Sequence, residues 1–213
     1  MRMTKFTHAC VRLDDGDRTL VIDPGTFSEC DVALAGADAV LVTHEHADHI
    51  DAEALRGAAE AQPGLRIWAP SSVTGNLTDL GSRVETVEPG DTFDAAGFAV
   101  QTFGGQHALI HPTIPVVANV GYLVSEAVYH PGDSFVVPDR PVETLLLPLH
   151  APWSKTGEVI DFLISVRATR AVQIHDALLN DTGRAGIEAH VRRLGDRYGT
   201  EFRHLDPQAY LDL

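Results

Sequence analysis

The chain has 213 residues, of which 44 % are hydrophobic and 22 % are charged, a composition typical of one soluble globular domain. Its formal net charge of −14, from 30 acidic and 16 basic residues, disfavours nonspecific binding to nucleic acid or to an anionic membrane. Only two cysteines occur, Cys10 and Cys30, and no charged-then-apolar leader precedes them, so we expect a reduced, cytoplasmic protein.

The first 25 residues have the pattern of a hairpin that ends in a turn. Residues 3–13 favour a strand, residues 14–17 (Asp-Asp-Gly-Asp) favour a turn, and residues 19–22 favour a second strand. Asp23-Pro24-Gly25 then ends this second strand. From the residues alone, Asp23 could be a plain turn aspartate.

The segment from Val40 to Ile50 carries the strongest chemical signal in the chain. Its apolar start predicts a buried strand, which is followed within six residues by His44, His46, Asp48 and His49. Loops after strands often hold one or two polar residues, but imidazoles and carboxylates at this density favour a divalent metal site. In an extended segment residues two apart point the same way, so His44 and His46 can hold one ion while Asp48 and His49 turn toward a second.

The rest of the chain alternates strands and helices in a way that repeats the first half. Asp51 can cap a helix that ends near residues 63–64, a second helix can start at residue 71 or 72, and Thr156 can cap a third. Apolar residues at helical spacing predict a final helix, with Ile187, Val191, Leu194 and Tyr198 on one face. The expected strands are residues 65–69, 84–87, 98–103, 122–124, 127–129, 143–149, 171–174 and 201–205.

Residues 95–125 contain no Asp, Glu, Lys or Arg. Several glycines and prolines interrupt this stretch, so it predicts buried strands and loops rather than a membrane span.

Further histidines stand at or near the ends of expected strands. His107 follows Gly104-Gly105-Gln106, and His175 directly follows the apolar strand 171–174, as His44 follows its own strand. His130 more often has a packing role at such a position. His150 begins a loop with Trp153 that either binds substrate or packs on the core.

The stretch from His44 to His49, His-Glu-His-Ala-Asp-His, resembles the signature of the metallo-β-lactamase superfamily, whose members are mostly dinuclear metallohydrolases. The resemblance covers nearly the whole chain and implies one α/β domain, residues 1–213. Two sheets would pack face to face with helices outside, an αββα sandwich with the metals at one edge.

The resemblance also assigns the ligands. It places one ion on His44, His46 and His107 and a second on Asp48, His49 and His175, with Asp133 of the Gly132-Asp133 element as the bridge. His111 is the alternative to His107. Asp48 and Asp133 become the catalytic carboxylates, and Asp23 supports the ligands from behind.

A finer resemblance links the opening Phe6-Thr7-His8-Ala9-Cys10 and the Asp23-Pro24-Gly25 turn to the group that contains ascorbate-6-phosphate lactonase. The candidates for substrate binding are His8, His111 and His150, and His8 is alternatively expected to support the ligands from beside the site. The expected function is hydrolysis of a small anionic ester, lactone or phosphodiester by a hydroxide held between two divalent ions. Zn²⁺ is the expected metal, with Mn²⁺ and Fe²⁺ as alternatives.

Two other functions stay open: a metal-dependent nuclease or phosphodiesterase, and a domain that binds metal and ligand without turnover. The expected partner is a small-molecule substrate, with neither nucleic acid nor membrane. The chain is too short and too acidic for the inserted RNA-binding arm of the larger nucleases.

Overall fold

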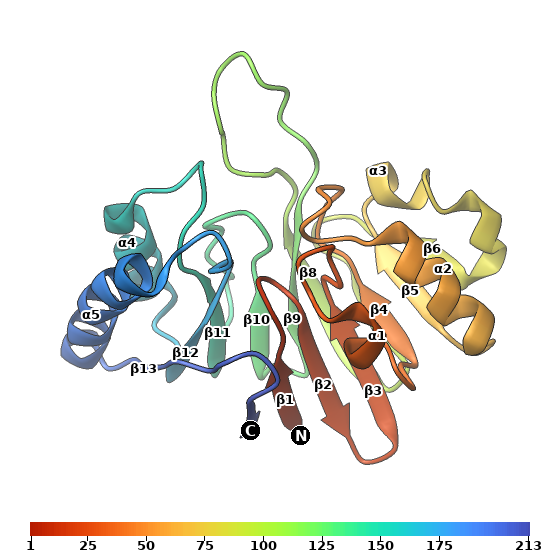
Figure 1. The fold of residues 1–213 in the computed structure, drawn as a ribbon, viewed down its shortest axis with the longest axis horizontal. Coiled ribbons are helices and arrows are strands. Elements are labelled where there is room, and N and C mark those ends of the chain that lie inside the picture. The colour runs from red at the N-terminus through yellow and green to blue at the C-terminus, as the bar shows by residue number, and fades with distance from the viewer.

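Two sheets of seven strands each lie face to face in the computed structural model, which describes residues 1–213 (Figure 1). The first sheet has the order β14 (Tyr210–Asp212), β1 (Arg2–Lys5), β2 (Val11–Asp15), β3 (Arg18–Ile22), β4 (Ala39–Leu41), β5 (Arg66–Ala69) and β6 (Val84–Thr86). The second has the order β13 (Glu201–Arg203), β12 (Arg170–Ile174), β11 (Thr144–Pro148), β10 (Val128–His130), β9 (Val120–Val124), β8 (Phe98–Gly104) and β7 (Thr92–Ala95).

Helices cover the outer face of each sheet, which completes the αββα sandwich (Figure 1). The first sheet is covered by α1 (Cys30–Ala33), α2 (Ala52–Ala61), α3 (Ser71–Thr74) and the 3₁₀ segment η1 (Thr78–Arg83). The second is covered by α4 (Thr156–Val166) and α5 (Asp181–Tyr198). None of the helices combines the length and the apolar character needed to span a bilayer.

The strands are apolar on both faces because each sheet is buried on both sides. In β3, Leu20 and Ile22 pack between the sheets, whereas Val21 packs under the helices of the first half. A third apolar cluster fills the space between β11 and β12 and the helices α4 and α5. Strands buried on two faces have near-continuous hydrophobic sequences, which explains runs such as Thr144–Pro148.

The parallel part of each sheet sets the place of the functional side chains. Strands β3, β4, β5 and β6 are parallel to one another, and so are β10, β11, β12 and β13. The carboxyl ends of parallel strands lie at one edge, where open α/β sheets bind ligands. Asp23, the His44 loop, Asp133 and His175 all follow such strand ends.

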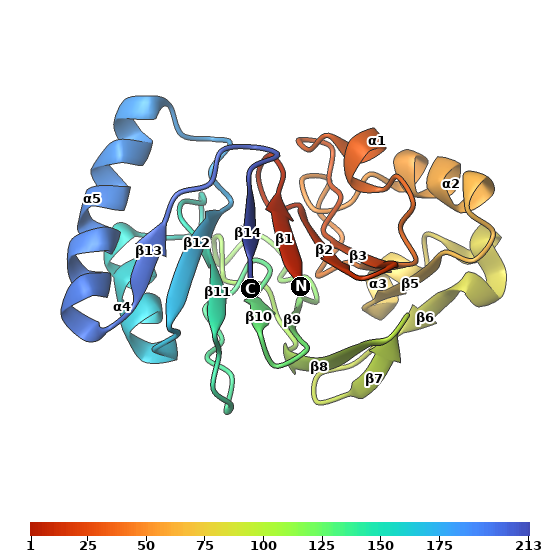
Figure 2. The ribbon, with the colours of Figure 1, turned by 90° about the horizontal axis from the view of Figure 1, so that it is seen from below.

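Several elements differ from the sequence prediction. The single strand expected over residues 3–13 is two antiparallel strands, β1 and β2, separated by a loop in which His8 has a φ of 66°. Strands β7 and β14 were not predicted; β14 is short and pairs with β1 in the middle of the view in Figure 2. Thr156 is the first residue of α4 and not its cap, because Glu158 accepts the hydrogen bond from the Lys155 N–H. Tyr198 ends α5 with its side chain exposed.

Candidate metal centre

The His44 loop is fixed by backbone contacts with the turn that follows β3. The Thr26 N–H donates to the Ala47 carbonyl (2.8 Å), and the Asp51 N–H donates to the Pro24 carbonyl (2.8 Å). Gly25 packs so closely that a Cβ there would overlap the Asp48 carbonyl oxygen. This close approach explains why glycine follows proline in the turn.

Two groups of potential ligand atoms lie side by side at this edge of the sandwich. The first group consists of His44, His46, His107 and Asp133, and its ligand atoms lie within 4.8 Å of one another. His44 Nε2 and His46 Nδ1 are 3.1 Å apart. Zn–N bonds of 2.0–2.1 Å at tetrahedral angles put ligand atoms about 3.3 Å apart, so this spacing fits one shared ion.

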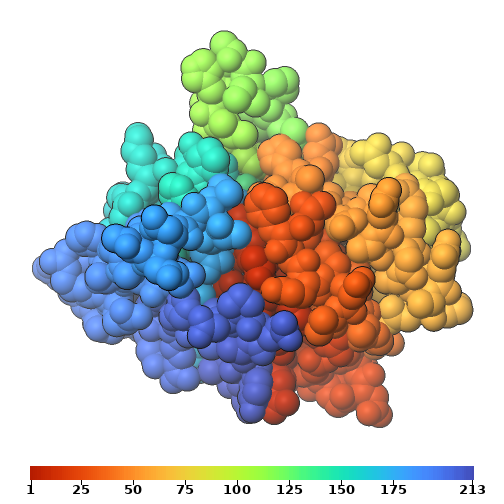
Figure 3. Space-filling model, viewed as in Figure 1, coloured from red at the N-terminus to blue at the C-terminus, as the bar shows by residue number.

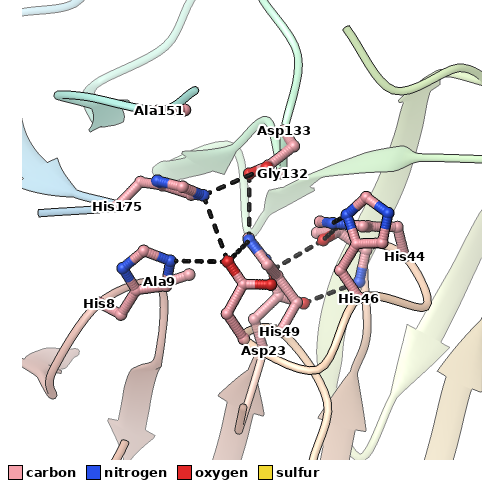
Figure 4. Close-up of polar contacts among 12 residues, drawn as sticks. His8, Ala9, Asp23, His44, His46, His49, Gly132, Asp133, Ala151 and His175 are labelled. Atoms are coloured by element: carbon pink, nitrogen blue, oxygen red, sulfur yellow. Dashed lines mark hydrogen bonds and ion pairs between the residues drawn. The ribbon is translucent and has the colours of Figure 1, made fainter. Parts of the chain in front are cut away.

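The second group consists of His8, Asp48, His49 and His175, whose ligand atoms also lie within 4.8 Å of one another. Figure 4 shows His49 and His175 turned toward Asp133, with His8 on one side of them and His44 and His46 on the other. The sequence prediction placed three of these four residues on the second ion, and the structure adds His8 beside them.

Asp133 lies between the two groups. Its Oδ1 is 3.0 Å from His49 Nε2, and its Oδ2 is 3.2 Å from His107 Nε2 and 3.1 Å from His175 Nε2. One carboxylate therefore contacts imidazoles of both groups, which is the position of a bridging ligand.

Asp23 lies behind both groups and orients a histidine in each. Its Oδ2 accepts a hydrogen bond from His49 Nδ1 (2.6 Å) and another from the Thr43 hydroxyl (2.7 Å). The Thr43 oxygen in turn contacts His44 Nδ1 at 3.0 Å. Assigning the Nδ1 protons to these bonds leaves Nε2 of both histidines free to bind a metal.

Backbone carbonyls orient the two histidines of the second half. His107 Nδ1 donates to the Ala108 carbonyl (2.6 Å), and His175 Nδ1 donates to the His150 carbonyl (2.7 Å). Because a carbonyl holds Nδ1 of each ring, Nε2 of each ring is left free and points toward Asp133.

The charge states suit metal binding. Burial lowers the pKa of His44 and of His46, which keeps both imidazoles neutral near pH 7. Burial alone would raise the pKa of Asp48, but the hydrogen bond from His8 and the nearby His49 and His175 lower it to about 2. Metal ligands must be neutral imidazoles or ionised carboxylates, and these three residues meet that condition. Burial would lower the pKa of His49, but Asp133 and Asp23 raise it well above its usual value, so a metal ion bound there would displace a proton.

Two buried polar atoms at the centre have no hydrogen-bond partner: His49 Nε2 and Asp133 Oδ1. Buried polar atoms are nearly always paired, because leaving one unpaired costs about 1–3 kcal/mol. These two atoms face each other at 3.0 Å, and a cation between the ligand groups would satisfy both. The residues present therefore fit a divalent metal centre.

The ligands form the base of an open pocket of about 280 Å³. Its wall combines metal-ligand side chains with apolar ones from four separate segments. The lining residues are Phe27, His46, Ala47, Asp48, His107, Ile110, Asp133, Pro152, Trp153, His175 and Leu178.

Comparison with known proteins places this centre in a family. Residues 2–175 match the model of the β-lactamase superfamily domain. The chain belongs to the β-lactamase superfamily.

The chain is also similar to two curated proteins and to a solved structure. The chain is 37 % identical over 214 residues to Protein Rv0786c of Mycobacterium tuberculosis, covering 98 % of each. It is 28 % identical to a UPF0173 metal-dependent hydrolase of Xanthobacter autotrophicus, over 71 % of this chain and 68 % of the relative. The structure of Igni18, a metallo hydrolase of Ignicoccus hospitalis, matches with a TM-score of 0.75 at 18 % identity, over 99 % of this chain and 97 % of that one.

His8 lies beside the site, as the sequence predicted, and of its two predicted roles its contacts favour the support of a ligand over substrate binding. Its side chain is fully buried and does not line the pocket. Its Nδ1 accepts a hydrogen bond from the Ala177 N–H (3.4 Å), and its Nε2 lies 3.0 Å from Asp48 Oδ2. Burial lowers the pKa of His8, and a neutral ring with this Nδ1 contact carries its proton on Nε2, where it donates to Asp48.

The other candidate histidines lie away from the pocket wall. His111 is exposed on the loop between β8 and β9, where its Nδ1 contacts the Thr113 hydroxyl (2.7 Å). His150 contributes its carbonyl to His175, and its side chain does not line the pocket. His130 is buried, with Nε2 donating to the Ala9 carbonyl and Nδ1 accepting from the Gly132 N–H, as a packing role requires.

Asn119 supports the bridging carboxylate and was not singled out from the sequence. Its side-chain oxygen accepts from the Asp133 N–H (2.9 Å), and its amide donates to the Pro131 carbonyl (2.9 Å). Gly132 has a φ of 61° and packs so tightly that a Cβ there would overlap this Asn119 oxygen. A lone asparagine in an uncharged stretch offers no spacing from which this role could be read.

Proposed function

We propose that the chain is a metal-dependent hydrolase that cleaves an ester, lactone or phosphodiester bond in a small molecule. The observation that carries the proposal is the pair of ligand groups joined by one buried carboxylate, with His49 Nε2 and Asp133 Oδ1 unpaired between them. Superfamily membership supports it, and so does the name of the Xanthobacter relative, a metal-dependent hydrolase.

When bound, two divalent ions would lower the pKa of a water to about 7 and polarise the oxygen of the bond under attack. His44, His46 and His107 would hold one ion, and Asp48, His49 and His175 the other, with Asp133 between them. Zn²⁺ suits a set dominated by imidazoles, and Mn²⁺ or Fe²⁺ would accept the same ligands.

The protein residues keep this arrangement ready for the reaction. Asp23 and two backbone carbonyls point imidazoles at the centre, and His8 holds Asp48 by a hydrogen bond. Two dications against the carboxylates of Asp48 and Asp133 leave a net positive charge, which favours a substrate whose reacting group is anionic or becomes so.

A panel of substrates tests the proposal: lactones, aryl esters, bis-aryl phosphodiesters, β-lactams and short RNAs, offered to metal-loaded protein, metal-stripped protein and the Asp48→Ala variant. We expect turnover of at least one small ester, lactone or phosphodiester that chelation abolishes and metal restores. Elemental analysis should find about two ions per chain, as two ligand groups require.

Two other outcomes would reject the proposal in different ways. Cleavage of RNA alone would place the chain among nucleases. Two bound ions without turnover of any member of the panel would favour a domain that binds metal and ligand without catalysis.

A further inference from the structure

Part of the pocket wall beside the ligands is apolar and carries no cation. Five apolar side chains form this part of the wall, which we call the apolar mouth: Phe27, Ile110, Pro152, Trp153 and Leu178. None of the lining residues is Lys or Arg. The mouth therefore offers no side chain that could pair with a phosphate or carboxylate carried away from the reacting bond.

Three of the side chains that form the apolar mouth are exposed to solvent. Phe27 is 46 % exposed, Ile110 37 % and Leu178 50 %. Large apolar side chains gathered at one place on a surface commonly mark a binding site. These side chains line the same pocket as the ligand residues. We therefore expect the molecule that binds in the pocket to cover them.

Trp153 presents only apolar surface to the pocket. Its sole polar atom, Nε1, donates to Asp133 Oδ2 at 2.8 Å. The indole also packs edge-on against Phe135, with ring centroids 5.0 Å apart. A ring fixed in this way forms a preorganised wall, which lowers the entropic cost of binding.

The loop between β8 and β9 extends the apolar wall away from the body of the protein. It projects at the top of Figure 1 and stands clear of the other segments in Figure 3. Ile110 comes from this loop, and its neighbour Leu109 and the nearby Ile114 are 55 % and 44 % exposed. The loop contains no charged residue, so the apolar surface continues outward from the pocket.

We infer that the apolar mouth binds an uncharged alkyl or acyl chain of the substrate, while the reacting bond lies at the ligand groups; this rests on the proposed function. The pocket, of about 280 Å³, is large enough for an apolar chain of several carbons beside the reacting group. The phosphate- or carboxylate-bearing substrates favoured from the sequence would leave their second charge without a partner.

Alkyl hydroxamates test the inference without turnover, because their hydroxamate group binds divalent metals. The series runs from acetohydroxamate to octanohydroxamate, with adipoyl monohydroxamate as the member that ends in a carboxylate, and isothermal titration calorimetry on zinc-loaded protein gives each Kd. We expect affinity to rise about twofold to fourfold per methylene over the first carbons of the series and to level off once the chain extends beyond the pocket. The carboxylate-ended compound should bind at least about tenfold more weakly than hexanohydroxamate.

A charge introduced into the mouth should reverse this preference. In Leu178→Lys we expect the affinity ratio of hexanohydroxamate to adipoyl monohydroxamate to fall by about tenfold or more, because the new ammonium pairs with the carboxylate. Val32→Lys is the matched control: Val32 is 52 % exposed on α1, outside the pocket, and the same change there should leave the ratio unaltered.

The results separate this inference from the proposed function. Chain-length-dependent binding without hydrolysis of any ester would retain the apolar mouth and reject the hydrolase. Metal-dependent hydrolysis with no chain-length preference would retain the hydrolase and reject the apolar mouth as the binding site of an alkyl chain. Absence of hydroxamate binding, or tighter binding of the carboxylate-ended compound by the unmodified protein, would overturn the inference.

Discussion

The pocket has two parts that differ in how they are built. The floor consists of the two ligand groups and Asp23; apart from His46 and Asp48, which face the pocket, its side chains are buried. The apolar mouth consists of side chains from loops, and Phe27, Ile110 and Leu178 are exposed by a third or more. The floor is fixed by a set of hydrogen bonds, whereas the mouth contacts it through the Trp153 hydrogen bond to Asp133 and the edge-on packing of Phe27 against His8.

This difference predicts different responses to mutation. In the floor most side-chain polar atoms have a hydrogen-bond partner, so a single change leaves another buried polar atom unpaired. In the mouth a change alters what binds but exposes no unpaired group. Activity and stability should therefore depend on the floor, and substrate choice on the mouth.

The largest effect is expected from Asp133→Ala, which removes the carboxylate shared by both ligand groups. We expect kcat/KM to fall roughly a thousandfold or more and bound metal to fall to one ion per chain or fewer, measured by steady-state kinetics and elemental analysis. His111→Ala is the control and should keep both ions. Full metal content in the Asp133 variant would show that this carboxylate does not bridge.

Lys5→Met should produce the largest loss of stability. Lys5 Nζ donates to Asp176 Oδ1 (3.2 Å) and to the Phe6 carbonyl (2.9 Å), and both charged side chains are at least nine-tenths buried. Removing the cation leaves the Asp176 carboxylate unpaired beside His175, which should lower the free energy of unfolding by about 3–5 kcal/mol in urea denaturation.

The control for this variant is Arg2→Met. Arg2 pairs with Asp212 where both side chains are at least half exposed, so stability should not change measurably. Equal losses of stability in the two variants would mean that the buried ion pair contributes no more to stability than the exposed one.

Asp23→Asn should weaken metal binding without removing a ligand. The amide keeps the shape of the carboxylate but can accept fewer of the bonds from His49 and Thr43, so metal affinity should fall about tenfold to a hundredfold in a chelator competition assay. Asp51→Asn is the control, since asparagine caps α2 as well as aspartate does. An unchanged affinity in Asp23→Asn would remove Asp23 from the group of residues that orient ligands.

The smallest effect is expected on the free energy of unfolding of the Leu178→Asn variant. Because Leu178 is half exposed, the free energy of unfolding should change by no more than about 0.5 kcal/mol, within the error of a thermal melt. A clear loss would show that the mouth is part of the packed core and that the contrast between the two parts is wrong.

The floor could largely be located from the sequence because its residues stand at chemically informative positions. The density of histidines after Leu41 and the repeat of a strand followed by histidine at His175 point to one edge of the sandwich. The structure brings all seven predicted ligands together there, with Asp23 behind them. The resemblance to the superfamily, which the comparison confirms, also predicted the αββα layers.

The mouth could not be predicted, because its residues share no local pattern. Phe27 follows the Gly25 turn, Ile110 belongs to a projecting loop, and Leu178 precedes α5; only the tertiary fold brings them together. The break between β1 and β2 was missed for a related reason. Residues 3–13 alternate like one strand, and nothing local shows that the chain breaks at a residue with a φ of 66°.

The ligands come from both sheets, and this has a consequence for folding. His44 and His107 join a loop after β4 to a loop after β8, and His49 and His175 join positions separated by more than half of the chain. A bound ion at either place acts as a cross-link that closes a long loop, as a disulfide does, and it restricts the unfolded chain most when the loop is long. In a chain whose two cysteines are both free thiols, a bound ion would be the cross-link between the two halves, in addition to the apolar core between the sheets.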